Sequence, residues 1–120
     1  MGTRRERRRA PTYSLESVKR LVEEGKVRIG SRPRVFIRNR VGRFDTKAFM
    51  QELFEALDPD DFYKTEELNV LPGTWADVYK SIPFTDAESG ETSDWYLKFY
   101  VEGDYLRVHV LSANYDGYIH

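Results

Sequence analysis

Five side chains in the last third of the chain are of the types that cleave phosphodiester bonds: Tyr96, Lys98, Tyr100, Arg107 and His109. When the 2′-oxygen of RNA attacks the adjacent phosphorus, a base accepts the hydroxyl proton and an acid protonates the leaving 5′-oxygen. Cations stabilise the charge on the phosphorane. Lys and Arg supply such charge, His titrates near neutrality, and Tyr can donate a proton or stack on a base. A solvated sheet face commonly carries the same residue types, so the pattern leaves both interpretations open.

A β-hairpin would bring these side chains together. Residues 95–101 and 106–111 alternate between apolar and polar positions, and Gly103-Asp104 between them is typical of a two-residue turn. This turn pairs Glu102 with Tyr105, Val101 with Leu106, Tyr100 with Arg107, Phe99 with Val108, and Lys98 with His109. The pleat then places the five candidate residues on one face. The other face is predicted to be buried and holds Trp95, Leu97, Phe99, Val101, Leu106, Val108 and Val110.

Two helices are predicted to support this sheet. The first runs from Ser14, its N-cap, to Glu24, and the second from Asp45, its N-cap, to Leu57; both carry apolar residues at helical spacing. Short strands are predicted at 26–29 and 75–79, with Pro83 ending the latter, and residues 85–93 are predicted to form an exposed polar loop.

The charge of the chain is strongly divided. Residues 1–43 hold 14 basic and 4 acidic residues, whereas residues 44–120 hold 5 basic and 16 acidic ones. Guanidinium groups pair with phosphate, so the arginines between Gly30 and Gly42 are candidate RNA-binding residues on a mobile basic loop or edge strand. We assign this role to Arg32, Arg34, Arg38 and Arg40, with Tyr100 as a stacking residue. The alternative is that the basic half neutralises the acidic half within one domain.

Length and composition narrow the class of protein. The 120 residues suffice for one domain, and we expect a flexible Arg-rich arm at 1–12, the domain at 13–111 and a loosely ordered tail at 112–120. There is no cysteine, and no apolar run is long enough to span a membrane, so the cytoplasm is the expected location. The Asp58-Pro-Asp-Asp run predicts a helix end rather than a metal site, and no cofactor motif is present.

Four segments of the chain resemble the MqsR toxin family in order and spacing. They are YSLESVKRLVEEGKVRI (13–29), DPDDFYKT (58–65), WADVY (75–79) and WYLKFYVEGDYLRVHV (95–110), and the similarity spans about residues 11–111. The resemblance implies a RelE-like α+β fold, with two helices packed on one face of a small, mostly antiparallel sheet. It also implies a ribosome-independent mRNA endoribonuclease that is held inactive by a cognate antitoxin of the MqsA type. Whether that antitoxin binds zinc and DNA is left open by the resemblance.

The family pattern places catalytic residues at Lys64 and Tyr96, and both are present. It also has a functional Gln where this chain has Ala76, and a Lys where it has Leu111. The full candidate catalytic set is therefore Lys64, Tyr96, Lys98, Arg107 and His109.

Two alternatives to an active nuclease remain. The first is a non-enzymatic member of the same family that binds RNA and antitoxin. The second, a DNA-binding regulator, rests on the N-terminal arginines alone, because no helix-turn-helix pattern is present.

Overall fold

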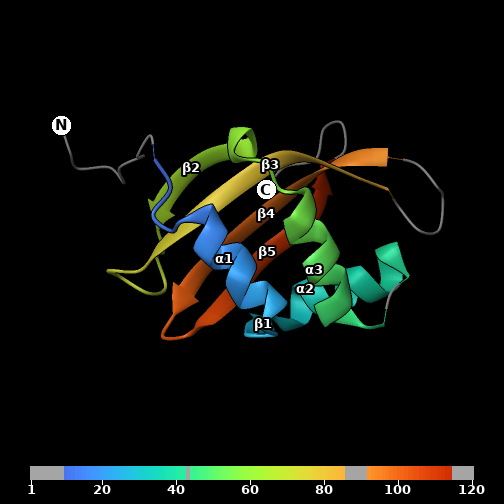
Figure 1. Cartoon of the computed structure of the whole chain (residues 1–120), viewed down its shortest axis with the longest axis horizontal. Coiled ribbons are helices and arrows are strands. Elements are labelled where there is room, and N and C mark those ends of the chain that lie inside the picture. Colours follow the sequence, from blue (N-terminus) through green and yellow to red (C-terminus); the bar gives the residue numbers. More distant parts are fainter. Residues whose placement is uncertain (1–9, 43, 86–91, 115–120) are drawn as a thin grey trace.

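The protein is described from a computed structural model that covers residues 10–42, 44–85 and 92–114; the side chains of 40–41, 81–85, 92–94, 110 and 112–114 are left aside. Within these ranges the chain is an α+β domain (Figure 1). Its elements are α1 (Leu15–Glu23), β1 (Val27–Ile29), α2 (Ser31–Phe36), the π-helical turn η1 (Ile37–Val41), α3 (Thr46–Ala56), the 3₁₀ turn η2 (Pro59–Asp61), β2 (Phe62–Glu67), β3 (Trp75–Thr85), β4 (Thr92–Glu102) and β5 (Tyr105–Asn114).

The five strands form one sheet in the order β1-β5-β4-β3-β2. The predicted mostly antiparallel sheet is confirmed, because β2 to β5 pair antiparallel with their chain neighbours. The exception is β1, which pairs parallel with β5 at the edge of the sheet. Within the described residues, no helix is long and apolar enough to cross a membrane.

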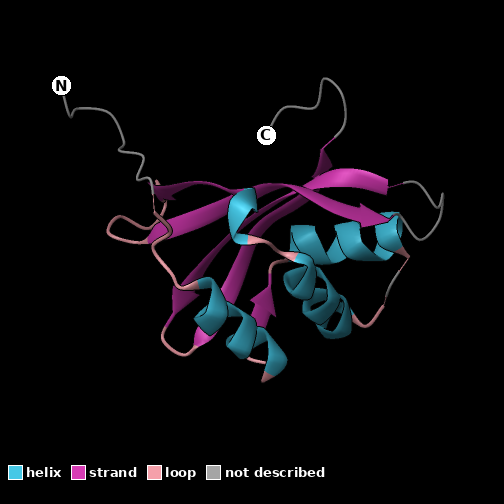
Figure 2. Cartoon of the chain, turned by 45° about the horizontal axis from the view of Figure 1, so that its top comes forward, coloured by secondary structure: helices cyan, strands magenta, loops and turns pink. Residues whose placement is uncertain are grey.

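Both predicted helices are confirmed, together with their caps. The Ser14 hydroxyl accepts a hydrogen bond from the Ser17 amide, and Asp45 caps α3 by accepting one from the Ala48 amide. Gly25 follows α1 with a φ of 77°, the left-handed conformation that ends a helix. Val18 and Val22 of α1 join buried residues of α3 and of β3 to β5 in the main core. Figure 2 shows α1 and α3 beside the sheet.

The prediction for residues 30–42 was wrong, because this segment forms α2 and η1 rather than a basic loop or edge strand. Pro33, Phe36 and Ile37 are spaced for one face of a helix, and that face packs into the core. Ile37 is fully buried, and the Phe36 ring lies 5.4 Å from that of Trp95. Gly42, with a φ of 78°, ends the segment.

The hairpin register is confirmed for four of its five predicted pairs. The fifth was wrong, because Lys98 pairs with Val110 instead of His109. A β-bulge at this point adds one residue to β5, so the next residue facing the core is Leu111, which pairs with Leu97 and is 5% exposed. Val110 was predicted to face the core, but its side chain is outside the described ones, so this prediction is not tested.

Three strands extend further than the sequence predicted: β3 and β5 at their ends, and β4 at its start. Strand β3 continues past Pro83 to Thr85, because its last residues pair with β4. On their other side no strand lies within the described part of the chain, since β2 pairs with β3 only as far as Tyr79. Proline is tolerated at such an edge, where its missing N–H costs no sheet hydrogen bond. Thr92 and Ser93 belong to β4, and residues 112–114 extend β5. The rest of the predicted loop (86–91) and tail (115–120), like residues 1–9, lies outside the described residues.

Candidate active site

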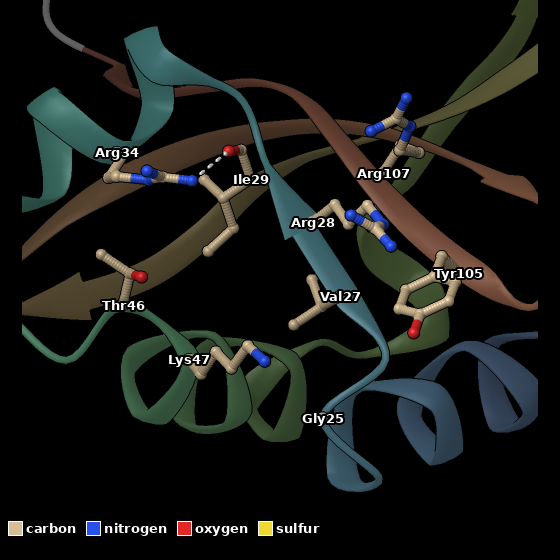
Figure 3. A pocket seen from close by; sticks show the side chains of 9 residues that line it. All are labelled: Gly25, Val27, Arg28, Ile29, Arg34, Thr46, Lys47, Tyr105 and Arg107. Carbon is tan, nitrogen blue, oxygen red and sulfur yellow. Dashed lines mark hydrogen bonds between the residues drawn. The ribbon is translucent and has the colours of Figure 1, made fainter.

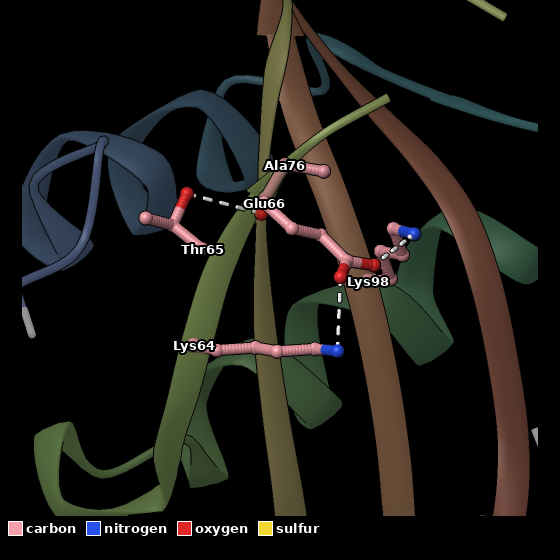
Figure 4. Close-up of polar contacts among 5 residues, drawn as sticks. All are labelled: Lys64, Thr65, Glu66, Ala76 and Lys98. Carbon is pink, nitrogen blue, oxygen red and sulfur yellow. Dashed lines mark hydrogen bonds and ion pairs between the residues drawn. The ribbon is translucent and has the colours of Figure 1, made fainter. Parts of the chain in front are cut away.

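Lys64 and Lys98 lie on the same face of the sheet and share one carboxylate. Both are register partners of Val78, Lys64 from β2 and Lys98 from β4, so β3 separates their backbones. Their ammonium groups meet at Glu66, with Nζ of Lys64 2.9 Å from Oε1 and Nζ of Lys98 2.7 Å from Oε2 (Figure 4). The three side chains are only 13–18% exposed. The sheet therefore holds two cations in fixed positions around a single anion.

Glu66 is ionised over the whole physiological range. Burial alone would raise its pKa, but hydrogen bonds and charge from Lys98 and Lys64 outweigh this effect and lower the pKa to about 2. At neutral pH the cluster of Lys64, Glu66 and Lys98 has two positive charges and one negative charge. Its net positive charge suits an anionic ligand such as a phosphodiester.

The depressed pKa of Glu66 predicts a defined pH dependence of stability. Ionised Glu66 stabilises the fold above its ordinary pKa of 4.5, and this contribution is lost as the pH falls towards about 2. We expect Glu66→Gln to lower the free energy of unfolding at pH 7, with the difference from the parent disappearing near pH 2. Urea unfolding at a series of pH values measures this.

The control for this experiment is Glu102→Gln. Glu102 also accepts from a cation, Arg107, but its side chain is 58% exposed, so the pair should contribute little. A Glu66→Gln deficit that does not change with pH would contradict the assignment.

Tyr96 is a protonated phenol beside this cluster. Burial raises its pKa, and the charges of Glu66 and Tyr63 raise it further. Its register partner on β3 is Lys80. A half-buried phenol that keeps its proton at neutral pH is suited to act as an acid.

His109 also favours its neutral form, which for an imidazole is the deprotonated one. Burial and the nearby charge of Lys98 lower the pKa of His109 below its ordinary value of 6.5. Its ring lies edge-on to that of Tyr100, with 6.4 Å between centroids. Although the predicted Lys98–His109 pairing was wrong, the bulge still leaves His109 within the electrostatic reach of Lys98.

Arg107 is engaged at the turn end of the hairpin. Its Nε donates to Oε1 of Glu102 at 2.9 Å. Its register partners are Tyr100 on β4 and Arg28 on β1. Tyr100 is 8% exposed and packs with Leu68 and Ala76 in a second small core, which leaves little of its ring for stacking on RNA.

The candidate RNA-binding arginines lie on α2 and the turn that follows it. Arg32, Arg34 and Arg38 are exposed. Arg34 is partly engaged, since its Nη2 donates to the carbonyl of Ile29 at 3.1 Å. The side chain of Arg40 and all of Arg43 lie outside the described residues.

Three residues near the site were not predicted as functional: Tyr63, Glu66 and Lys80. Nζ of Lys80 lies 3.8 Å from the centroid of the Tyr63 ring, a cation–π contact, and Tyr63 is 40% exposed. The spacing of Lys64 and Glu66, two residues apart, could have indicated that they share one face of a sheet. This requires that residues 62–67 first be recognised as a strand. Among the described residues, no group of three or more His, Asp or Glu side chains is arranged to hold a metal ion.

The two departures from the family pattern occupy different environments. Ala76 is fully buried and is the register partner of Glu66, so its position adjoins the cluster of Lys64, Glu66 and Lys98. Leu111 belongs to the main core. A side chain at position 111 therefore lies among apolar residues in this chain, away from the face that carries Lys64 and Lys98.

Comparison with known proteins identifies the class. A family model described as "Motility quorum-sensing regulator, toxin of MqsA" matches residues 10–112. The α+β domain is thus the toxin of a toxin–antitoxin system. The chain belongs to the MqsR toxin family. A search of curated proteins found no match.

Proposed function

We propose that this toxin is a metal-independent mRNA endoribonuclease with a RelE-like arrangement, acting without the ribosome. The observation that carries the proposal is the pair of half-buried ammonium groups that meet at Glu66 next to a protonated tyrosine. Such a site offers fixed positive charge and a proton donor at the same place, as cleavage by 2′-oxygen attack requires.

Each side chain has a separate role in this mechanism. Neutral His109 accepts the 2′-hydroxyl proton, Lys64 and Lys98 stabilise the charge on the phosphorane, and Tyr96 donates its proton to the leaving 5′-oxygen. The electrostatic contacts support this order, because Lys98 affects His109 and Glu66 affects Tyr96. His109 and Tyr96 are thus both within electrostatic range of the Lys98–Glu66 ion pair. Arg107 is the register partner of Tyr100, whose ring adjoins His109, and adds positive charge on that side of the base.

The role of Glu66 in this mechanism is to position the lysines. With a pKa of about 2 it is too weak a base to accept the hydroxyl proton. Its two oxygens instead fix the Nζ atoms of Lys64 and Lys98, so less side-chain entropy is lost when the phosphate binds.

The second candidate function is RNA and antitoxin binding without turnover. Buried Ala76 favours it, because an alanine offers no polar group next to Glu66 where the family pattern has a functional Gln. The two candidates are separated by incubating purified protein with a purified mRNA in the absence of ribosomes. We expect discrete fragments from the parent chain; intact mRNA that is nevertheless bound would establish the non-enzymatic alternative.

Membership of a toxin family implies an antitoxin partner, and we propose one of the MqsA type. We further propose the cytoplasm as the location, since mRNA and an antitoxin are both found there. The antitoxin is expected to bind a surface that leaves Lys64 and Tyr96 open. A complex in which the antitoxin covers these two side chains would contradict this.

The lowered pKa of His109 gives a kinetic prediction. A base must be neutral, so the cleavage rate should fall as the pH drops through the pKa of His109, which lies below 6.5. We expect the parent to show this acid limb in its pH–rate profile and His109→Gln to lack it. An unchanged profile and rate in His109→Gln would show that His109 does not act in catalysis.

A further inference from the structure

A basic cavity of about 440 Å³ lies beside β1 at the edge of the sheet (Figure 3). Lys64, Glu66 and Lys98 are not among the residues that line it. Strand β1, helix α2, the start of α3, the beginning of β5 and Gly25 line it. Four of its nine lining residues are cationic and none is acidic: Arg28, Arg34, Lys47 and Arg107. Its size lies within the range of small-ligand sites, and its charge selects an anion.

The cations keep donors for a ligand. The Arg28 guanidinium carbon lies 4.3 Å from the centroid of the Tyr105 ring, a cation–π contact, and the guanidinium N–H groups have no hydrogen-bond acceptor among the described residues. Lys47 makes no hydrogen bond or ion pair with any other residue in the described ranges. Arg34 and Arg107 each use one nitrogen, towards Ile29 and Glu102 respectively. Guanidinium forks with free donors match the geometry of a phosphate group.

The cavity is connected to the candidate active site through the sheet register. Arg28 is paired with Arg107, Arg107 is paired with Tyr100, and the Tyr100 ring adjoins His109. Strands are spaced by about 4.8 Å, so Arg28 on β1 lies roughly 10 Å from Tyr100, the residue level with it on β4. Lys98 and Tyr96 lie two and four residues further along β4. This separation is on the scale of a short stretch of single-stranded RNA.

We propose that this cavity is a phosphate subsite, which binds a backbone phosphate of the same RNA strand a short stretch away from the one that is cleaved. Tyr105, 38% exposed, offers ring surface to the neighbouring base. The proposal rests on the proposed function in one respect, namely that the ligand is RNA. It adds a second anchoring point, which sets the position of the strand relative to Lys64 and Tyr96.

The test measures binding rather than cleavage. In a Lys64→Ala background, Arg28→Ala and Lys47→Ala are each titrated against a fluorescent single-stranded RNA of about 12 nucleotides over a series of salt concentrations. We expect each change to weaken binding several-fold and to reduce the slope of log affinity against log salt by about 0.7, the value for one lost phosphate contact. Arg20→Ala, which removes an exposed arginine of α1 outside the cavity, is the matched control and should change neither quantity.

The outcomes separate this proposal from the nuclease assignment. If the parent does not cut mRNA but the two cavity variants lose affinity for the oligonucleotide, the nuclease is rejected and the subsite stands. If the parent cuts mRNA while the cavity variants bind the oligonucleotide as Arg20→Ala does, the subsite alone is rejected. It is also rejected if the parent does not bind the oligonucleotide.

Discussion

Lys64→Ala and Tyr96→Phe are each expected to lower the rate of RNA cleavage by roughly 10²-fold or more. Lys64→Ala removes one of two cations at the phosphorane, and Tyr96→Phe removes only the phenolic proton donor. Glu66 keeps its 2.7 Å contact with Lys98 in both variants, so the fold should persist. Single-turnover rates on a defined RNA, together with thermal unfolding of each variant, measure the two effects separately.

The matched control is Lys26→Ala. Lys26 forms an exposed ion pair with Glu24 at 3.6 Å, and its removal changes the net charge as Lys64→Ala does. We expect it to cut RNA at nearly the parental rate. Parental rates in both Lys64→Ala and Tyr96→Phe would show that the site has been assigned to the wrong residues.

The largest expected effect on stability comes from Asp77, the fully buried carboxylate of β3. Its two oxygens accept hydrogen bonds from the backbone amides of Thr12 and Tyr13, at 2.9 and 3.0 Å. Asp77→Ala leaves two partly buried amides without their acceptor, at a cost of about 3 kcal/mol. Urea unfolding measures this directly, and the loss should be smaller in Asp77→Asn, which keeps one acceptor oxygen.

Asp60→Ala is the control for Asp77, since it removes an exposed carboxylate near the end of α3. Its free energy of unfolding should stay within about 0.5 kcal/mol of the parent. A similarly small change in Asp77→Ala would mean that these amides find other partners. The N-terminal segment would then depend on its remaining contacts, which include the bond from the Tyr13 hydroxyl to the carbonyl of Trp75 at 2.6 Å.

Local sequence signals predicted the parts of this fold that local interactions determine. Ser14 and Asp45 cap helices because their side-chain oxygens reach amides three residues on, and Gly103 allows a tight turn through its φ of 62°. These features depend on a few neighbouring residues. The two helices and most of the hairpin register could therefore be predicted from the sequence.

Features that depend on distant strands could not be predicted in this way. The bulge at His109 preserves an alternating pattern on either side, so the sequence alone does not indicate where the extra residue falls. The parallel pairing of β1 with β5 joins segments about 80 residues apart. Glu66 meets Lys98 only because β3 aligns β2 with β4.

One residue in the WADVY segment (75–79) that resembles the family has a structural role. The Asp of the Trp-x-Asp-Val-Tyr motif is Asp77, which bonds the segment before α1 to the sheet rather than facing Lys64 and Lys98. The WADVY segment thus contains both Asp77, which holds the segment before α1, and Ala76, whose position adjoins Glu66.

The central claim, metal-independent cleavage by 2′-oxygen attack, is tested most directly by the ends of the RNA fragments. Purified protein is incubated with a purified mRNA in excess EDTA, and the fragment termini are analysed. Attack by the 2′-oxygen, assisted by Tyr96, His109 and the two lysines, predicts undiminished cleavage with 2′,3′-cyclic phosphate and 5′-hydroxyl ends. Loss of cleavage in EDTA, or fragments with 5′-phosphate and 3′-hydroxyl ends, would contradict the account.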